Sequence, residues 1–224
     1  MIKAVTFDVD GTLVDSVDFH ALAWHEAFKH FGHDVTFEQA RSQIGKGGDQ
    51  LLPTFLSEEE IADHGEALEQ WRSKRFKSAY LASVRPFCAV PLLLQRVRDA
   101  GLKVAVASSA KEDELHTYLD IAGVTKLVDM TSSSSDADNS KPAPDIFEAV
   151  LAKLKLKGSD AIAVGDAPYD AQASGKAGME CIGMLAGGFT EESLRAAGCV
   201  EVYPGPAALF ARFDASPIGA FKQR

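Results

Sequence analysis

Aspartates stand directly after two short apolar runs of the sequence, and they are the residues best suited to chemistry. Asp8 and Asp10 follow the run that begins at Ala4, and Asp166 follows the run that begins at Ala161. Three carboxylates in one crevice would repel one another unless a cation lay among them, and clustered oxygen ligands select a hard ion such as Mg²⁺. The pattern therefore predicts a magnesium site formed by Asp8, Asp10 and Asp166.

Such a site could act on a phosphate ester only if positive charge offset the repulsion. A carboxylate about 4 Å from a phosphate dianion costs roughly 8 kcal/mol at an effective dielectric of 20. The metal and Lys141, a compact cation on a flexible stem, could offset this cost. Asp8 could then attack phosphorus and form an aspartyl-phosphate, which divides hydrolysis into two easier displacements.

The residues after Asp8 suit proton transfer and phosphate binding. Asp10 stands two positions on, and alternate residues of an extended chain share a face, so it can point at the same reacting centre. We expect Asp10 to protonate the leaving alcohol and afterwards to deprotonate water. Gly11 allows a sharp turn beside the bound phosphate, and Thr12 is free to orient Asp10.

Polar groups also follow the other apolar runs. Ser108 and Ser109 come after the second run, and the Ser108 hydroxyl suits a non-bridging phosphoryl oxygen, with helix-start amides assisting. Asp170 lies four residues after Asp166. We therefore assign Ser108 and Ser109 to phosphate binding and expect Asp170 to lie in the same crevice.

The elements that would position these residues alternate along the chain. Helical patterns over 90–100 and 113–122 end at glycine and lie between short apolar runs. This alternation predicts an α/β fold with a parallel sheet, and in such a sheet the ligand site lies beyond the carboxyl ends of the strands. The predicted strands are 4–9, 103–107, 127–130, 161–165 and 180–185.

The region 16–84 breaks this rhythm, because it contains helical stretches and no convincing strand. We expect a helical insertion there, with residues 1–15 and 85–224 forming the core. The last helix of the insertion should run from Ser57 or a little later toward Tyr80. Two capping boxes support the helices, Thr36 with Gln39 and Ser57 with Glu60.

Residues 131–144, rich in serine, proline and acids, are predicted to form a loop, which would be a flexible connector if taken in isolation. The stretch from 204 to the end of the chain matches no motif and is assigned no function.

Bulk properties exclude several classes of protein. The 46% hydrophobic and 25% charged residues are typical of a globular protein, and the net charge of -9 argues against nucleic-acid binding. The three cysteines cannot all pair, which favours a reducing cytoplasm. Neither a signal peptide nor an apolar run of about 18 residues is found, so we expect no membrane partner. We expect a monomer, with a dimer as the alternative.

Four motifs, taken together, resemble the haloacid dehalogenase superfamily: FDVDGT at 7–12, VAVASSA at 104–110, SKPAPDIF at 140–147 and GDAPYD at 165–170. The resemblance covers nearly the whole chain and implies a Rossmann-like core with an inserted helical cap that closes over the substrate. It implies these roles: Asp8 as nucleophile and metal ligand, Asp10 as acid/base and ligand through its carbonyl, Ser108 and Lys141 as phosphate binders, Asp166 as metal ligand, and Asp170 as a further acid acting directly or through water.

Within this superfamily the chain resembles phosphoglycolate phosphatase and the sugar-phosphate phosphatases and mutases with the same cap. Mutases tend to carry glutamate where this chain has Gly165, which favours hydrolysis of a small phosphomonoester over a phosphomutase reaction. The dehalogenases themselves fit badly, because they need no metal and lack the second aspartate. A non-catalytic binding module would not require the Asp8 and Asp10 pair.

Residues of the insertion leave alternatives open. His20 could hydrogen-bond near Asp10, although we favour a role limited to supporting the hinge. The loop 45–48, which carries Lys46, is either a substrate-specificity loop or a plain helix–helix turn, with equal support for each. Three aromatic residues at helical spacing are predicted to lie in a core: Trp24, Phe28 and Phe31.

Overall fold

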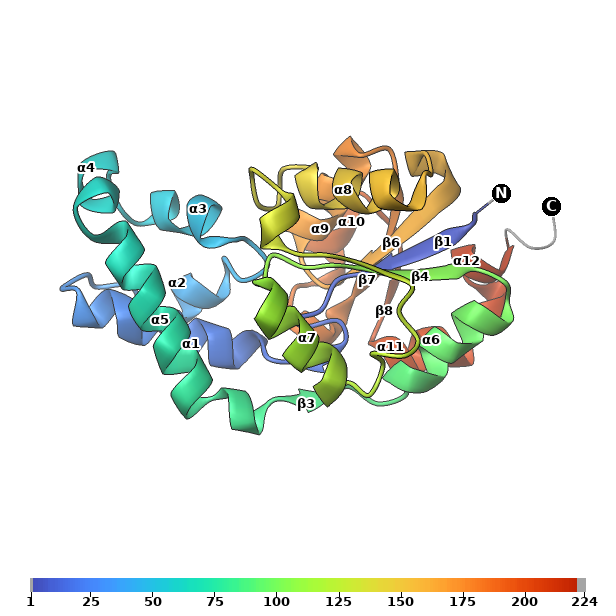
Figure 1. Ribbon diagram of the computed structural model, residues 1–224, viewed down its shortest axis with the longest axis horizontal. Helices are drawn as coiled ribbons and strands as arrows, with labels where there is room; N and C mark the ends of the chain where they lie inside the picture. The colour runs from blue at the N-terminus through green and yellow to red at the C-terminus, as the bar shows by residue number, and fades with distance from the viewer. Residues whose placement is uncertain (1, 221–224) are drawn as a thin grey trace.

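The computed structural model describes residues 2–220 and contains a six-stranded sheet in the order β5-β4-β1-β6-β7-β8 (Figure 1). All neighbouring strands of this sheet are parallel. The chain fills one side of β1 first and then crosses to the other side, which places a topological switch point beside β1. The strands are β1 (Ala4–Phe7), β4 (Lys103–Ala107), β5 (Met130–Ser132), β6 (Ala161–Gly165), β7 (Glu180–Met184) and β8 (Cys199–Tyr203).

Helices cover both faces of the sheet, so its central strands are buried on both sides. Alternate residues of β1 belong to different cores: Val5 and Phe7 pack with one apolar cluster, and Ala4 packs with the other. The larger cluster includes side chains of α6 (Val90–Asp99), α7 (Glu112–Ile121) and α11 (Pro206–Ala211), and the smaller includes those of α8 (Asp145–Leu154), α9 (Pro168–Lys176) and α10 (Glu191–Ala196). A short helix, α12 (Pro217–Ala220), follows.

A second group of helices lies at the left of Figure 1. Along the chain these helices come between β2 (Val14–Asp15) and β3 (Arg85–Pro86), two short strands that pair with each other in antiparallel fashion. These helices, called here the α1–α5 block, surround an apolar cluster of their own. Its helices are α1 (Val17–His30), α2 (Phe37–Arg41), α3 (Gly48–Leu51), α4 (Glu58–Glu60) and α5 (Glu66–Ala79), with a π-helical turn over Ile61–Gly65.

Several predictions for this block are confirmed. Both capping boxes form, and helical structure runs from the Ser57 cap to Tyr80, interrupted in type only by the π turn. Trp24 and Phe28 are buried in the block's cluster, and Phe31 packs against it half-buried. Within residues 2–220 no helix combines the length and apolar character needed to cross a membrane.

The predicted strands at the sheet centre are present, although β1 and β7 end earlier than expected, and the predictions for the edge strands were wrong. The third strand is Met130–Ser132 rather than 127–130, because β5 is an edge strand that pairs only with β4 and so tolerates polar residues. β8 was not predicted, since Glu201 interrupts its apolar pattern. β1 ends at Phe7, because the Val9 carbonyl already accepts hydrogen bonds from the turn that follows.

The loop after β5 is shorter than predicted, since its first two residues belong to the strand. It contains a 3-10 turn over Ser134–Asp136 and carries Lys141, whose side chain is fully buried. The connector is therefore anchored to the protein interior.

Candidate active site

Three buried carboxylates meet at the carboxyl ends of β1 and β6. One oxygen from each of Asp8, Asp166 and Asp170 lies within 4.8 Å of the others. Asp8 follows β1, Asp166 follows β6, and Asp170 lies in the first turn of α9. The parallel register of β1 with β6 brings these segments together, as the strand order requires.

Lys141 neutralises part of this group from the loop before α8. Its Nζ lies 2.5 Å from Asp8 Oδ1 and 2.8 Å from Asp170 Oδ1, and it donates to the Ala107 carbonyl at 3.1 Å. Burial alone would lower the pKa of Lys141, but the two carboxylates outweigh it and raise the pKa above its usual value. The ammonium is therefore held charged at the centre of the site.

The pKa values of Asp8 and Asp10, the two aspartates of the first motif, are shifted in opposite directions. Burial raises the pKa of Asp8 to about 7, against the opposing effect of Lys141. For Asp10 burial also acts to raise the pKa, but His20 and Ser16 outweigh it, and the net shift is downward. Asp8 therefore holds its proton close to neutral pH unless further positive charge is present, whereas Asp10 ionises readily.

The charge of this group fits a divalent cation. Three buried carboxylates face a single ammonium, and burial followed by the charges of Asp170 and Asp8 raises the pKa of Asp166 well above its usual value. Hard oxygen donors of this kind suit Mg²⁺. The side chains brought together are those of Asp8, Asp166 and Asp170. Among the residues that the structure describes, the carboxylate of Asp10 does not belong to this group. We therefore still expect Asp10 to bind the metal through its backbone carbonyl.

Two glycines allow the Asp166 carboxylate to sit where it does. A Cβ added to Gly187 would lie 1.7 Å from Asp166 Oδ2, and one added to Gly11 would lie 2.3 Å from the same oxygen. Gly11 also has a φ of +79°. Neither position can carry a side chain without displacing this carboxylate.

Asp10 is held by residues of the first helix and its cap. Ser16 Oγ donates to Asp10 Oδ1 at 2.5 Å, and His20 Nε2 lies 3.1 Å from the same oxygen. His20 thus makes the contact near Asp10 that was the less favoured of its two expected roles. Its ring stacks on Phe76, with centroids 4.0 Å apart, which fixes its plane.

Tyr118 extends this hydrogen-bonded group. Its hydroxyl lies 3.0 Å from His20 Nε2 and donates to Glu114 Oε1 at 2.8 Å. Because the hydroxyl proton points to Glu114, the phenol oxygen can accept from His20 Nε2, the atom that also faces Asp10. Burial, followed by the charges of Asp10 and Glu114, raises the pKa of Tyr118, so the phenol stays neutral.

Thr12 does not orient Asp10, contrary to expectation. Its hydroxyl donates to Asp166 Oδ1 at 3.3 Å, and Ser16 takes the expected role beside Asp10. Sequence reasoning missed Ser16 and Tyr118. The position of Ser16 just before a helix was a signal of a capping residue only, since its hydroxyl turns to Asp10 instead of capping.

The serines after β4 lie at the same edge of the sheet. Ser108 is buried, and its Oγ accepts from the Ala110 backbone N–H at 3.1 Å. Ser109 Oγ is buried without a hydrogen-bond partner among the described residues, and this side chain lines the cavity beside Asp8. An unsatisfied hydroxyl in this position is available to a ligand.

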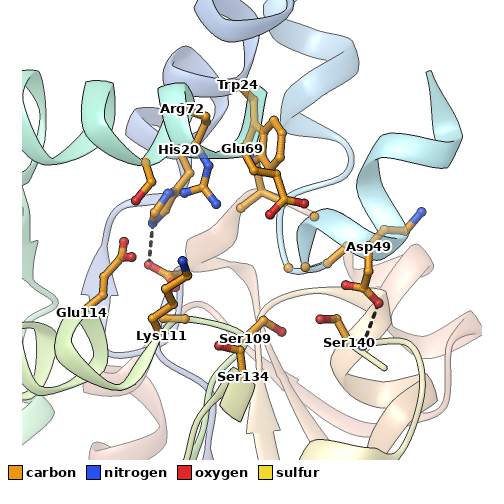
Figure 2. Close-up of a pocket in the computed structure, with 18 of the residues that line it drawn as sticks. His20, Trp24, Asp49, Glu69, Arg72, Ser109, Lys111, Glu114, Ser134 and Ser140 are labelled. Carbon is orange, nitrogen blue, oxygen red and sulfur yellow. Dashed lines mark hydrogen bonds and ion pairs between the residues drawn. The ribbon is translucent and has the colours of Figure 1, made fainter. Parts of the chain in front are cut away.

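A cavity of about 410 Å³ opens between these residues and the α1–α5 block (Figure 2). Asp8, Asp10 and Ser109 line its base, and the loop 45–48 and α5 line the opposite side. Lys46 Nζ donates to Gln43 Oε1 at 2.6 Å and lies 4.8 Å from the centroid of the Tyr169 ring. The loop 45–48 therefore borders the cavity, as a specificity loop would.

Hydrogen bonds also join the block to segments beyond the carboxyl ends of the strands, around this cavity. Asp49 Oδ2 accepts from the Ser140 backbone N–H at 3.0 Å, Tyr169 donates to the Ser42 carbonyl at 2.8 Å, and Arg41 donates to the Gly187 carbonyl at 3.1 Å. The block is thus seated against the residues on either side of the carboxylate group.

The sequence is similar to a known family and to known proteins. Residues 5–184 match the model of the haloacid dehalogenase-like hydrolase family. The chain is 33% identical over 190 residues to the protein SUPPRESSOR OF QUENCHING 1 of Arabidopsis thaliana, covering 81% of this chain and 18% of that protein. It is 29% identical to a phosphoglycolate phosphatase of Vibrio parahaemolyticus, covering 83% of this chain and 85% of that one.

Solved structures share the fold. A hydrolase from Pseudomonas syringae gives a TM-score of 0.86 at 24% identity, covering 95% of this chain and 98% of that chain. A beta-phosphoglucomutase from Clostridium difficile gives 0.78 at 21% identity and covers both chains completely. The expected Rossmann-like α/β core is confirmed by these neighbours and by the parallel sheet. The chain belongs to the haloacid dehalogenase-like hydrolase family.

Proposed function

We propose that the protein is a magnesium-dependent phosphatase that hydrolyses small phosphomonoesters through an aspartyl-phosphate on Asp8. The observation that carries this proposal is the buried group of Asp8, Asp166 and Asp170 around the single ammonium of Lys141. Its surplus negative charge calls for a cation, and its position at the base of a cavity gives a phosphate ester access to Asp8. The phosphatase names of its relatives support the same reaction.

Each residue of the site has a task in this proposal. Mg²⁺, held by Asp8, Asp166 and the Asp10 carbonyl with Asp170 nearby, would offset the negative charge of the phosphate. Asp8 attacks phosphorus while Lys141, with Ser108, Ser109 and the amides around Gly11, holds the phosphoryl oxygens. Thr12 steadies Asp166.

Asp10 supplies the protons. It gives a proton to the leaving alcohol and takes one from the water that later attacks the aspartyl-phosphate. Ser16 and His20 hold its carboxylate toward the ionised form, which suits the second step, and they fix its orientation for both.

Residues 16–84 are proposed to act as a cap on a core of residues 1–15 and 85–224. Support comes from the separate apolar cluster of the α1–α5 block and from the cavity beneath it. A cap that closes over the substrate keeps bulk water from the reacting phosphorus. We propose a monomer acting on a small phosphorylated metabolite in the cytoplasm.

Hydrolysis is favoured over a mutase reaction by the position of Gly165. A Cβ added to Gly165 would lie 2.5 Å from both Cβ and Cγ of Asp170, so this backbone leaves no room for the glutamate that mutases tend to carry. Product analysis separates the two reactions: hydrolysis releases inorganic phosphate from a sugar phosphate, whereas a mutase forms an isomer when primed with a bisphosphate.

The test of the proposal is a panel of phosphate esters assayed with and without chelator, on the wild type and on Asp8→Asn. We expect phosphate release that requires Mg²⁺ and Asp8. Activity that survives both chelation and the substitution would overturn the mechanism.

A further inference from the structure

The part of the cavity that faces the leaving group is lined by charged side chains, and most of these are already engaged or exposed. Lys111 and Asp138 are exposed to solvent at the rim. Four others have hydrogen-bond partners within the protein: Lys46 with Gln43, Asp49 with Ser140, Glu66 with Gln70, and Glu114 with Tyr118. Each of these groups already has a partner in the protein before any ligand binds.

Glu69 and Arg72 differ from the rest. They lie three residues apart on α5, both are half-buried, and Figure 2 shows both side chains at the cavity with no hydrogen bond or ion pair drawn to either. Arg72 Nε is buried without a hydrogen-bond partner among residues 2–220, and the guanidinium carbon lies 4.7 Å from the centroid of the Trp24 ring. The aromatic ring therefore holds the guanidinium in place, while its Nε–H lacks a partner among the residues that the structure describes.

Glu69 lies against the loop 45–48, which lines the same side of the cavity as α5. A Cβ added to Gly48 would come within 1.9 Å of Glu69 Oε1, so this loop fits closely around the carboxylate. Burial is the largest cause that raises the pKa of Glu69, and Arg72 opposes it from a distance. The carboxylate is half-buried and has no hydrogen bond or ion pair with another residue in the part of the chain that the structure describes.

Unpaired polar groups in a partly desolvated place are costly, and a ligand that satisfies both regains that cost. A carboxylate or a second phosphate on the leaving group would pair with Arg72 and be repelled by Glu69. An ammonium group would pair with Glu69 and be repelled by Arg72. A hydroxyl both donates and accepts, so two neighbouring hydroxyls can donate to Glu69 and accept from Arg72.

We propose that the leaving group is an uncharged polyhydroxy compound, as in a sugar or polyol phosphate, whose hydroxyls bind between Glu69 and Arg72. This proposal rests on the phosphatase function proposed above. A cavity of about 410 Å³ is of a size that accommodates such a molecule.

The first experiment compares kcat/KM for three classes of ester. Glucose 6-phosphate and ribose 5-phosphate carry hydroxyls, 2-phosphoglycolate and 3-phosphoglycerate carry a carboxylate, and phosphoethanolamine carries an ammonium group. The wild type is expected to favour the sugar phosphates by at least tenfold, since its unpaired groups reject partners of a single charge. Equal or faster hydrolysis of either charged class overturns the proposal.

The second experiment measures the ratio of kcat/KM for the better sugar phosphate to that for 4-nitrophenyl phosphate, which has no hydroxyls to bind. Glu69→Gln and Arg72→Gln are each expected to lower this ratio about tenfold or more. The control is Glu59→Gln, an exposed residue outside the cavity that loses the same charge; it should leave the ratio unchanged. A ratio that is unchanged in both cavity variants rejects the proposed role of the pair.

The outcomes also distinguish a failure of the proposed substrate class from a failure of the proposed phosphatase function. If 4-nitrophenyl phosphate is hydrolysed by the wild type and not by Asp8→Asn, the phosphatase function stands, and only the substrate class is decided by the ratios. If the wild type hydrolyses none of the esters, the phosphatase function fails, and the substrate class fails with it.

Discussion

The raised pKa of Asp8 predicts that the metal-free protein loses stability as the pH rises. The carboxyl has a pKa of about 7 in the folded protein against an ordinary value of 3.8. Between these values the unfolded chain has released the proton while the folded protein retains it, so the free energy of unfolding falls with increasing pH. A difference of about 3 pKa units corresponds to roughly 4 kcal/mol lost between about pH 4 and pH 7.

Replacing Asp8 isolates this effect. In Asp8→Asn the titrating group is gone, so urea unfolding in EDTA at pH 5, 6, 7 and 8 should show a smaller fall in stability than in the wild type. The contact with Lys141 is also changed, which shifts the overall stability, and the informative quantity is therefore the slope with pH. Asp34→Asn, a substitution at an exposed aspartate, is the control and should keep the wild-type slope.

Mg²⁺ should reverse the effect, because a cation bound at the site stabilises the ionised carboxylates and the folded state that holds them. Added Mg²⁺ is thus expected to raise the unfolding midpoint most at pH 7–8. Identical slopes for the wild type and Asp8→Asn in EDTA would refute the assignment of a proton to Asp8 near neutral pH.

Three further predictions concern the same site. Lys141→Met should abolish measurable activity and lower the free energy of unfolding by about 3–5 kcal/mol, measured in urea, because the buried carboxylates lose their cation. Ser16→Ala removes a hydrogen bond that lowers the pKa of Asp10, so the limb of the pH–rate profile that reports this group should move to higher pH; an unmoved limb would contradict the assignment. Gly187→Ala should weaken Mg²⁺ binding in titration calorimetry, whereas Gly175→Ala, in a helix with open space around it, should bind Mg²⁺ like the wild type.

The central part of the fold was predictable from the sequence because fully buried parallel strands appear as continuous apolar runs. β4 and β6 have the predicted bounds, and the rule that ligands bind at the carboxyl ends of strands placed Asp8 and Asp166 together. Edge strands carry no such signal. β5 and β8 each have one neighbour, and their mixed polar and apolar residues resemble a loop when read alone.

The surroundings of Asp10 could not be predicted, because they depend on contacts between distant parts of the chain. Tyr118 lies 98 residues from His20, and nothing in its helical pattern distinguishes a core tyrosine from one that bonds to an imidazole. The same holds for Glu69 and Arg72, because the sequence does not show that they lie at the cavity without a partner among the described residues. Local patterns specify which face of a helix is buried, and tertiary packing decides which polar group it meets.

The hydrogen bond between Asp49 and the Ser140 backbone has a mechanical consequence. Ser140 is joined by one peptide bond to Lys141, so the helical block grips the chain directly beside the ammonium that neutralises Asp8. If the α1–α5 block moved away from the sheet to admit an ester, the hydrogen bond between Asp49 and Ser140 would break, and the loop next to Lys141 would be released from the block. Entry of the substrate would then be linked to movement of the loop that carries this lysine, while the contacts of the lysine with Asp8 and Asp170 stay within the sheet part of the chain.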